Sequence, residues 1–197
     1  RLPAAANGKR WATLADEDDM DAALAWVAQL NAPDVGGSCA FFGLNPRKSH
    51  GQSGNAGTSH ARAYAADFDG GATVPEVLKR IAAAGLPDPT VVVHSGNGVH
   101  CYWVLHLQED DLKTWTHRQR WLAAALQSDA AVKDPQRLLR LPGFVNRKHK
   151  YHQAPPTAQL VVCEPGRRYS WKDLQPKHTP EPLQPRDFTP EELAAMP

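Results

Sequence analysis

Two apolar segments joined by a glycine-rich turn restrict most strongly what this chain can fold into. Residues 90–95 read TVVVHS and residues 99–107 read VHCYWVLHL, with GNG between them. Branched and aromatic residues favour strands, and a short glycine-containing connection favours a tight hairpin. The sequence therefore predicts two adjacent antiparallel strands, which excludes a purely helical bundle.

Segments with helical spacing of apolar residues lie on both sides of this hairpin. Helices are predicted for residues 16–30, 74–81 and 109–126. Further strands are predicted for residues 38–46, 62–69 and 158–164, and a strand–turn–strand unit for residues 137–149. Helices mixed with strands in this way indicate an α/β or α+β sandwich.

Charge and cysteine content limit the class of protein further. The formal net charge is +1, so any contact with nucleic acid would depend on local basic clusters. Three cysteines, at positions 39, 101 and 163, form no CxxC pair and predict a reducing, cytoplasmic location without a cysteine zinc site. No apolar run approaches the roughly 20 residues of a membrane helix, so no membrane partner is expected.

A pair of acidic residues follows the apolar part of one predicted strand. Residues 62–71 read RAYAADFDGG, with Asp67 and Asp69 two positions apart, and residues i and i+2 of a strand point to the same face. Two exposed acids before a Gly-Gly turn are also ordinary turn chemistry. The alternative is a site for Mg²⁺ or Mn²⁺, because these ions prefer hard oxygen ligands and would keep both carboxylates ionised.

The hairpin turn and the residues beside it form a second candidate element. The glycines of SGNG would expose backbone N–H groups able to bind phosphate, with Ser95 and His100 within reach. A plain hairpin with a structural histidine is the other interpretation.

The third candidate element, residues 128–150, reads SDAAVKDPQRLLRLPGFVNRKHK and combines acids with a dense basic run. A run of charges is usually a solvated surface. Here apolar residues are interleaved with the charges around the Pro142–Gly143 turn, which favours a segment whose polar face lines a site. Basic groups there could neutralise a triphosphate or a template backbone.

The order of DFD, SGNGVHCYW and SD..V....R..RLPGFVNRK resembles the archaeo-eukaryotic primase superfamily. More narrowly, it resembles the primase-polymerases and RepB-type replication primases of plasmids and phages, over about residues 38–150. The resemblance implies an RRM-like catalytic sheet packed against an N-terminal α/β unit. It also implies a catalytic domain over residues 1–175, followed by a Pro-rich linker and the start of a C-terminal segment over residues 176–197.

The resemblance also implies roles for individual residues. The metal-binding and catalytic acids would be Asp67, Asp69 and Asp129, with Asp134 as the other candidate for the third acid. The nucleotide-binding residues would be Ser95, His100, Arg140, Asn146 and Lys148. Two Mg²⁺ or Mn²⁺ ions, nucleoside triphosphates, and a single-stranded DNA template and primer are the implied cofactors and partners. A helicase region is expected in the same, longer chain.

The implied function is template-dependent nucleotidyl transfer, in which a DNA primase or polymerase makes or extends primers by two-metal phosphoryl transfer. Two alternatives stay open. One is an inactive relative that binds nucleotides or single-stranded DNA. The other is a metal-dependent nickase of the rolling-circle kind, although its closest histidines, His94 and His100, are widely spaced for that chemistry.

Overall fold

The structure is a computed structural model that describes residues 17–33, 38–48, 54–148 and 153–175. The α-helices are α1 (Glu17–Asn31), α2 (Val74–Ala83) and α3 (Leu112–Leu126). The strands are β1 (Phe41–Gly43), β2 (Ala61–Phe68), β3 (Val91–His94), β4 (Val99–Glu109), β5 (Leu138–Arg140) and β6 (Gln159–Cys163). Two short 3-10 helices, η2 and η4, span Asn55–Gly57 and Trp171–Leu174. The expected linker, residues 176–197, lies outside the described residues.

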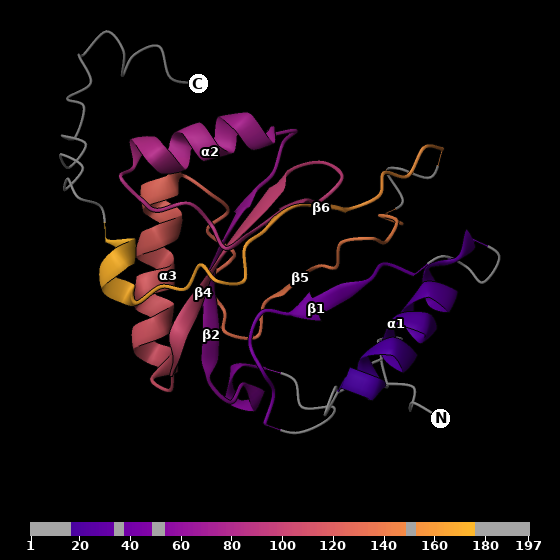
Figure 1. Cartoon of the computed structure of the whole chain (residues 1–197), viewed down its shortest axis with the longest axis horizontal. Coiled ribbons are helices and arrows are strands. Elements are labelled where there is room, and N and C mark those ends of the chain that lie inside the picture. Colours follow the sequence, from indigo (N-terminus) through magenta and orange to yellow (C-terminus); the bar gives the residue numbers. More distant parts are fainter. Residues whose placement is uncertain (1–16, 34–37, 49–53, 149–152, 176–197) are drawn as a thin grey trace, which may run out of the picture.

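The strands form two separate antiparallel sheets. Four strands pair in the order β2-β4-β3-β6, and β1 pairs with β5 in a two-stranded ribbon. Helices α2 and α3 cover one face of the four-stranded sheet, and the β1–β5 ribbon and α1 lie on its other side (Figure 1). This arrangement confirms the predicted mixed α+β fold class.

Helix α3 covers the free edge of β2, and this contact positions part of the site. An edge strand exposes unpaired N–H and C=O groups on alternate residues, and buried groups of this kind need partners. Trp115 Nε1 donates to the Ala63 carbonyl (3.1 Å), and the Gln119 amide both accepts from Ala65 N and donates to Ala65 O (3.1 and 2.6 Å). Two residues further along β2, the backbone N–H of Asp129 donates to the Asp67 carbonyl (2.8 Å). The segment after α3 is therefore held beside the end of β2.

The predicted hairpin is present, and its turn contacts the end of β2. Strands β3 and β4 pair through Val91↔Tyr102 to His94↔Val99, and β4 pairs with β2 through Asp67↔His100. The backbone N–H of Gly71 donates to the Asn97 carbonyl in the turn (3.0 Å). The glycine-rich turn and the acidic end of β2 are thus neighbours in space.

The structure corrects three details of the sequence prediction. Beyond the Pro142–Gly143 turn, residues 137–149 form no second strand that pairs with β5; in the described part, Val145 makes only an isolated bridge to Thr157. Helix α3 begins at Leu112 rather than at residue 109, because Asp111 accepts hydrogen bonds from the N–H groups of residues 113 and 114 as its N-cap. On α1, Met20 and Leu24 are 42% and 39% exposed, so this helix does not bury the whole of its expected apolar face.

Within the described residues, no helix combines the length and apolar character that a membrane-spanning helix needs.

Candidate functional site

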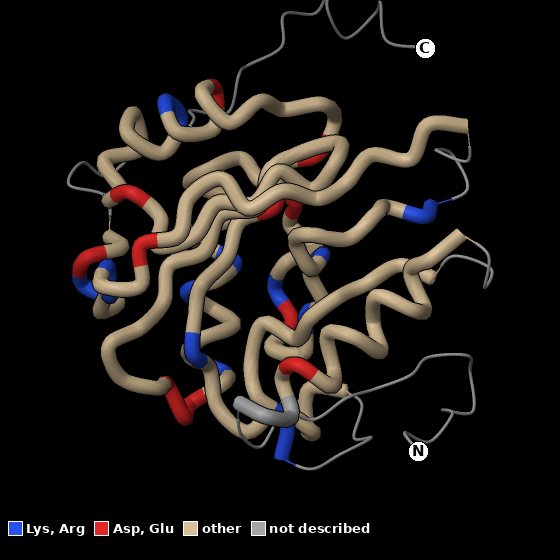
Figure 2. Tube along the Cα trace, turned by 45° about the vertical axis from the view of Figure 1, so that its right-hand side comes forward, with Lys and Arg blue, Asp and Glu red and all other residues tan. Residues whose placement is uncertain are grey.

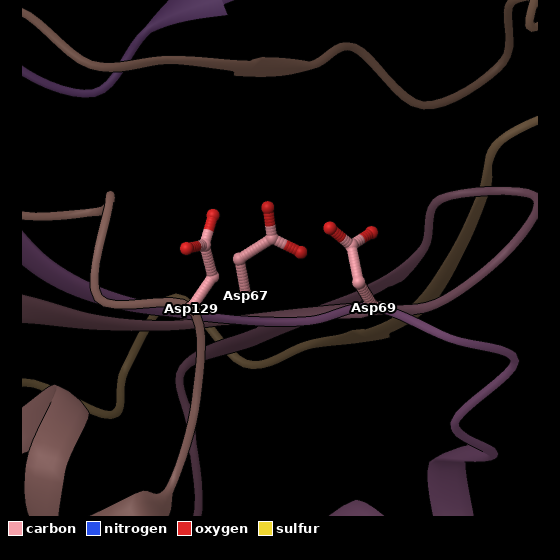
Figure 3. A group of neighbouring side chains, drawn as sticks. All are labelled: Asp67, Asp69 and Asp129. Atoms are coloured by element: carbon pink, nitrogen blue, oxygen red, sulfur yellow. The ribbon is translucent and has the colours of Figure 1, made fainter. Parts of the chain in front are cut away.

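Three acidic side chains converge on the face of the four-stranded sheet that is opposite α2 and α3. Asp67 lies at the end of β2, Asp69 directly follows that strand, and Asp129 follows α3. Each offers a carboxylate oxygen, and these oxygens lie within 4.8 Å of one another. Figure 3 shows the three carboxylates side by side, pointing in the same direction from the sheet. The structure thus brings together all three residues expected to be metal ligands.

Asp129 is held in place by its own neighbours. Its Oδ1 accepts a hydrogen bond from the backbone N–H of Ala131 (2.8 Å), and its Oδ2 lies 3.3 Å from Arg137 Nη2. Asp134, the other candidate for the third acid, is not a member of the cluster found among the described residues. Of the two candidates, the geometry therefore favours Asp129.

Asp67 is the most buried of the three acids and the most unusual electrostatically. Burial, followed by the charges of Asp69 and Asp129, raises the pKa of the Asp67 carboxyl to about 6. Its Oδ1 is buried, lies 3.4 Å from His100 Nε2, and accepts no hydrogen bond from any described residue. A buried carboxylate oxygen without a donor, beside two more carboxylates, is an environment that a cation would stabilise.

His100 lies opposite Asp67 on β4 and is fixed by a second residue. Its Nδ1 lies 3.1 Å from the hydroxyl of Tyr102, and burial, followed by the nearby charges of Arg140, Arg137 and Lys148, lowers the pKa of His100 to about 4. The imidazole is therefore neutral near pH 7. The two distances fit the tautomer in which Nε2 carries the proton toward the Asp67 carboxylate and the Tyr102 hydroxyl donates to Nδ1.

A cavity of about 140 Å³ opens next to the acids, between the four-stranded sheet and the β1–β5 ribbon. All five residues expected to bind nucleotide line it: Ser95, His100, Arg140, Asn146 and Lys148. Arg140 is 5% exposed, and its Nη1 has no hydrogen-bond partner within the described part of the chain. Acidic and basic segments are close together in this central region of the molecule (Figure 2). One side of the cavity is thus suited to cations and the other to anions.

The donor set fits a divalent metal ion of the hard type. Three carboxylates within 4.8 Å offer only oxygen ligands, which Mg²⁺ and Mn²⁺ prefer, and Asp67 Oδ1 is a buried acceptor to which no described residue donates. The unpaired guanidinium nitrogen of Arg140, on the other side, fits a phosphate oxygen.

The residues that sequence reasoning missed include Tyr102, Phe41 and Arg137, which lines the cavity and lies 3.3 Å from Asp129. Tyr102 is two positions from His100 on the same strand, so the alternation of strand side chains could have identified it. Phe41 lines the cavity from β1, and its ring lies under the Arg140 guanidinium, whose Cζ is 4.9 Å from the ring centroid. The pairing of β1 with β5 that brings Phe41 there has no short-range signal in the sequence.

We expect Asp67→Asn to make the metal-free protein more stable at pH 8 but not at pH 4. Below about pH 4, Asp67 is protonated in both the folded and the unfolded state, so its titration does not lower the free energy of unfolding. As pH rises to about 6, the unfolded state ionises first, so the wild type loses stability that the variant keeps. The difference at pH 8 should be about 3 kcal/mol, because one pH unit in pKa corresponds to about 1.4 kcal/mol. Urea denaturation in a chelator measures it.

Asp110→Asn is the control, because this acid is exposed and lies outside the cavity. It should change the free energy of unfolding little at either pH. If the difference in the free energy of unfolding between the wild type and Asp67→Asn were the same at pH 4 and pH 8, the raised pKa assigned to Asp67 would be contradicted.

The family model described as the RepB DNA-primase N-terminal domain matches residues 55–182. The AEP domain of the primase-polymerase of cyanophage S-2L has a similar structure, with a TM-score of 0.61 and 23% identity over 83% of this chain and 77% of that chain. A comparison with curated protein sequences gave no match.

Two structures of primase RepB′ are also similar. One has a TM-score of 0.56 and 18% identity over 81% of this chain and 48% of that chain, so the present chain spans about half the length of that RepB′. The other is the catalytic domain of RepB′ in complex with initiator DNA, with a TM-score of 0.55 and 19% identity over 83% of this chain and 74% of that chain. At these identities the likeness demonstrates a common fold.

Proposed function

Because the chain belongs to the RepB DNA-primase N-terminal domain family, we propose that residues 1–175 are the catalytic domain of a DNA primase or primase-polymerase. It makes or extends primers on single-stranded DNA during plasmid or phage replication. The observation that carries this proposal is a cluster of three carboxylates, two of which line the same cavity as an Arg140 nitrogen that has no partner among the described residues. The residues from 176 onward would link this domain to a further region, such as a helicase.

Asp67, Asp69 and Asp129 are the residues that would hold two divalent ions, Mg²⁺ or Mn²⁺. Bound there, the ions would activate a 3′-hydroxyl and stabilise the pyrophosphate that leaves. The chain's own contribution is then positioning and electrostatics, with little covalent chemistry.

The opposite side of the cavity would bind the triphosphate of the incoming nucleotide. Arg140 offers a buried guanidinium nitrogen that lacks a partner among the described residues, and His100 lines the same cavity. Lys148 is more exposed and adds positive charge at the rim, and Ser95 and Asn146 add polar side chains. Donors fixed before the substrate arrives need no reorganisation as charge develops during the reaction.

Incubation with labelled nucleotide, Mn²⁺ and a single-stranded template tests the proposal. Extension of an annealed primer is expected, and products from the unprimed template would add initiation of primers. Nucleotide or DNA binding without synthesis would favour an inactive binding module, and a cut template would favour a nickase. Either result would overturn the proposed polymerase activity.

A further inference from the structure

Phe41 is a large apolar side chain in a mostly polar site. It lies on the three-residue strand β1 and is 46% exposed, yet it lines the same cavity as Asp67, His100 and Arg140. In a stable small domain, exposed aromatic rings beside a polar cavity are candidates for ligand contact.

The ribbon holds the Phe41 ring in a defined place. Phe41 is the direct cross-strand partner of Arg140, so the two side chains share one face, and the Arg140 Cζ lies 4.9 Å from the ring centroid. Two residues further along the same face of β1 is Gly43, opposite Leu138. A side-chain carbon at Gly43 would meet only Asn45 O, at 3.5 Å. The neighbouring position on this face of β1 therefore carries no side chain, and the Phe41 ring itself is exposed.

The size of the cavity indicates what part of a nucleotide reaches Phe41. Its volume of about 140 Å³ is below the roughly 300–1,000 Å³ of sites that enclose a whole small molecule. The inner lining is ionic, which suits phosphates and metal ions. The nucleoside part would then lie at the mouth of the cavity, where Phe41 and Leu138 provide apolar surface.

We propose that Phe41 stacks on the base of the incoming nucleotide and so positions it over the acids. This inference rests on the proposed nucleotidyl transfer and adds a positioning residue that the sequence motifs do not include. Since every base has a flat aromatic face, the contact is expected to be tolerant of base identity. Arg140 would then lie between the base and the phosphates of the nucleotide. Its guanidinium lies over the Phe41 ring, and its Nη1, which lacks a partner among the described residues, would bind the phosphates.

Binding of nucleotides and of inorganic tripolyphosphate to Phe41 variants tests the proposal. Tripolyphosphate carries the phosphates without a base, so it separates stacking from phosphate binding. In calorimetry with Ca²⁺ as the divalent ion, Phe41→Ala should raise the Kd of dATP and of dTTP by about 10-fold, within the range that base–aromatic stacking contributes. The Kd of tripolyphosphate should not change. Phe41→Trp should bind dATP as tightly as the wild type does.

Leu160→Ala is the matched control, because Leu160 is also an exposed apolar residue (52%) but lies on β6, outside the cavity lining. It should leave all three Kd values unchanged. Phe41→Leu keeps apolar volume without the aromatic plane, and should resemble Phe41→Ala.

Two results would overturn the stacking role while leaving the proposed function intact. In the first, Phe41→Ala binds dATP and dTTP like the wild type. In the second, Phe41→Ala weakens tripolyphosphate as much as it weakens the nucleotides, which would mean that the ring acts only through Arg140. A wild type that binds neither nucleotide nor tripolyphosphate would overturn the proposed function together with the inference.

Discussion

Replacement of Asp67, Asp69 or Asp129 by Asn is expected to abolish nucleotide incorporation while the protein stays folded. Each change removes a negative charge from a cluster whose oxygens lie within 4.8 Å. Fewer charges would hold the proposed divalent ions less tightly, and those ions would supply the charge that stabilises the transition state. We expect a loss of at least about 1,000-fold in the rate of primer extension, similar to the loss of a principal electrostatic contact in other enzymes.

The same variants should be no less stable than the wild type in a chelator, because like charges that are close together repel. Asp134→Asn is the most informative control, since Asp134 was the other candidate for the third acid and lies outside the cluster. It should extend primers at the wild-type rate. An Asp129→Asn protein with normal activity, or an Asp134→Asn protein without it, would overturn the assignment of the third ligand.

The local part of this site was predictable from the sequence. The apolar run before Asp67 and the glycine-rich turn after residue 95 each predict structure over a few residues. The hairpin sets the register of β3 against β4 and so places Ser95 near His100. The register that brings His100 opposite Asp67 belongs to the pairing of β4 with β2, which these short-range signals do not contain.

The convergence of Asp129 depends on contacts that no short pattern contains. Trp115 and Gln119 bind the backbone of β2 from a helix that is about fifty residues away in sequence. Their spacing along α3 matches the spacing of alternate residues on the strand. This match places Asp129 N beside the Asp67 carbonyl. From the residues alone, Asp129 and Asp134 were both acceptable, and the resemblance to a family was needed to prefer one.

The prediction for residues 137–149 was right about the first strand and the turn, but its second strand was wrong for a related reason. A turn at Pro142–Gly143 suggests that the flanking residues pair with each other. Instead, β5 pairs with the distant β1, and the segment after the turn bonds to residues 156–158, as in Asn146 N to Pro156 O (2.7 Å). Because β1 and β5 have only three residues each, neither signals its partner, and Phe41 could not be placed in the site.

Gly98→Ala is expected to cost more stability than any other single methyl group added to the hairpin turn, and to remove activity as well. A side-chain carbon at Gly98 would lie 2.1 Å from the Phe68 carbonyl oxygen and 3.2 Å from the Asp69 Cα. Both neighbours are backbone atoms, so neither can rotate away, and the turn would have to separate from the end of β2. We expect a loss of about 3 kcal/mol or more in the free energy of unfolding, the upper part of the range for overpacking.

Gly166→Ala is the matched control, because a side-chain carbon there would meet nothing within 4 Å and its backbone does not require glycine. This control should have the wild-type free energy of unfolding in urea denaturation and the wild-type rate of primer extension. The two kinds of inactive variant should then differ in stability. Gly98→Ala should lower the free energy of unfolding, whereas the Asp→Asn variants should not. If Gly98→Ala were as stable as Gly166→Ala, the turn would not press against β2, and the hairpin could not be what holds His100 and Ser95 at the acids. Lost activity at unchanged stability would contradict the structure in the same way, because the clash requires both to fall together.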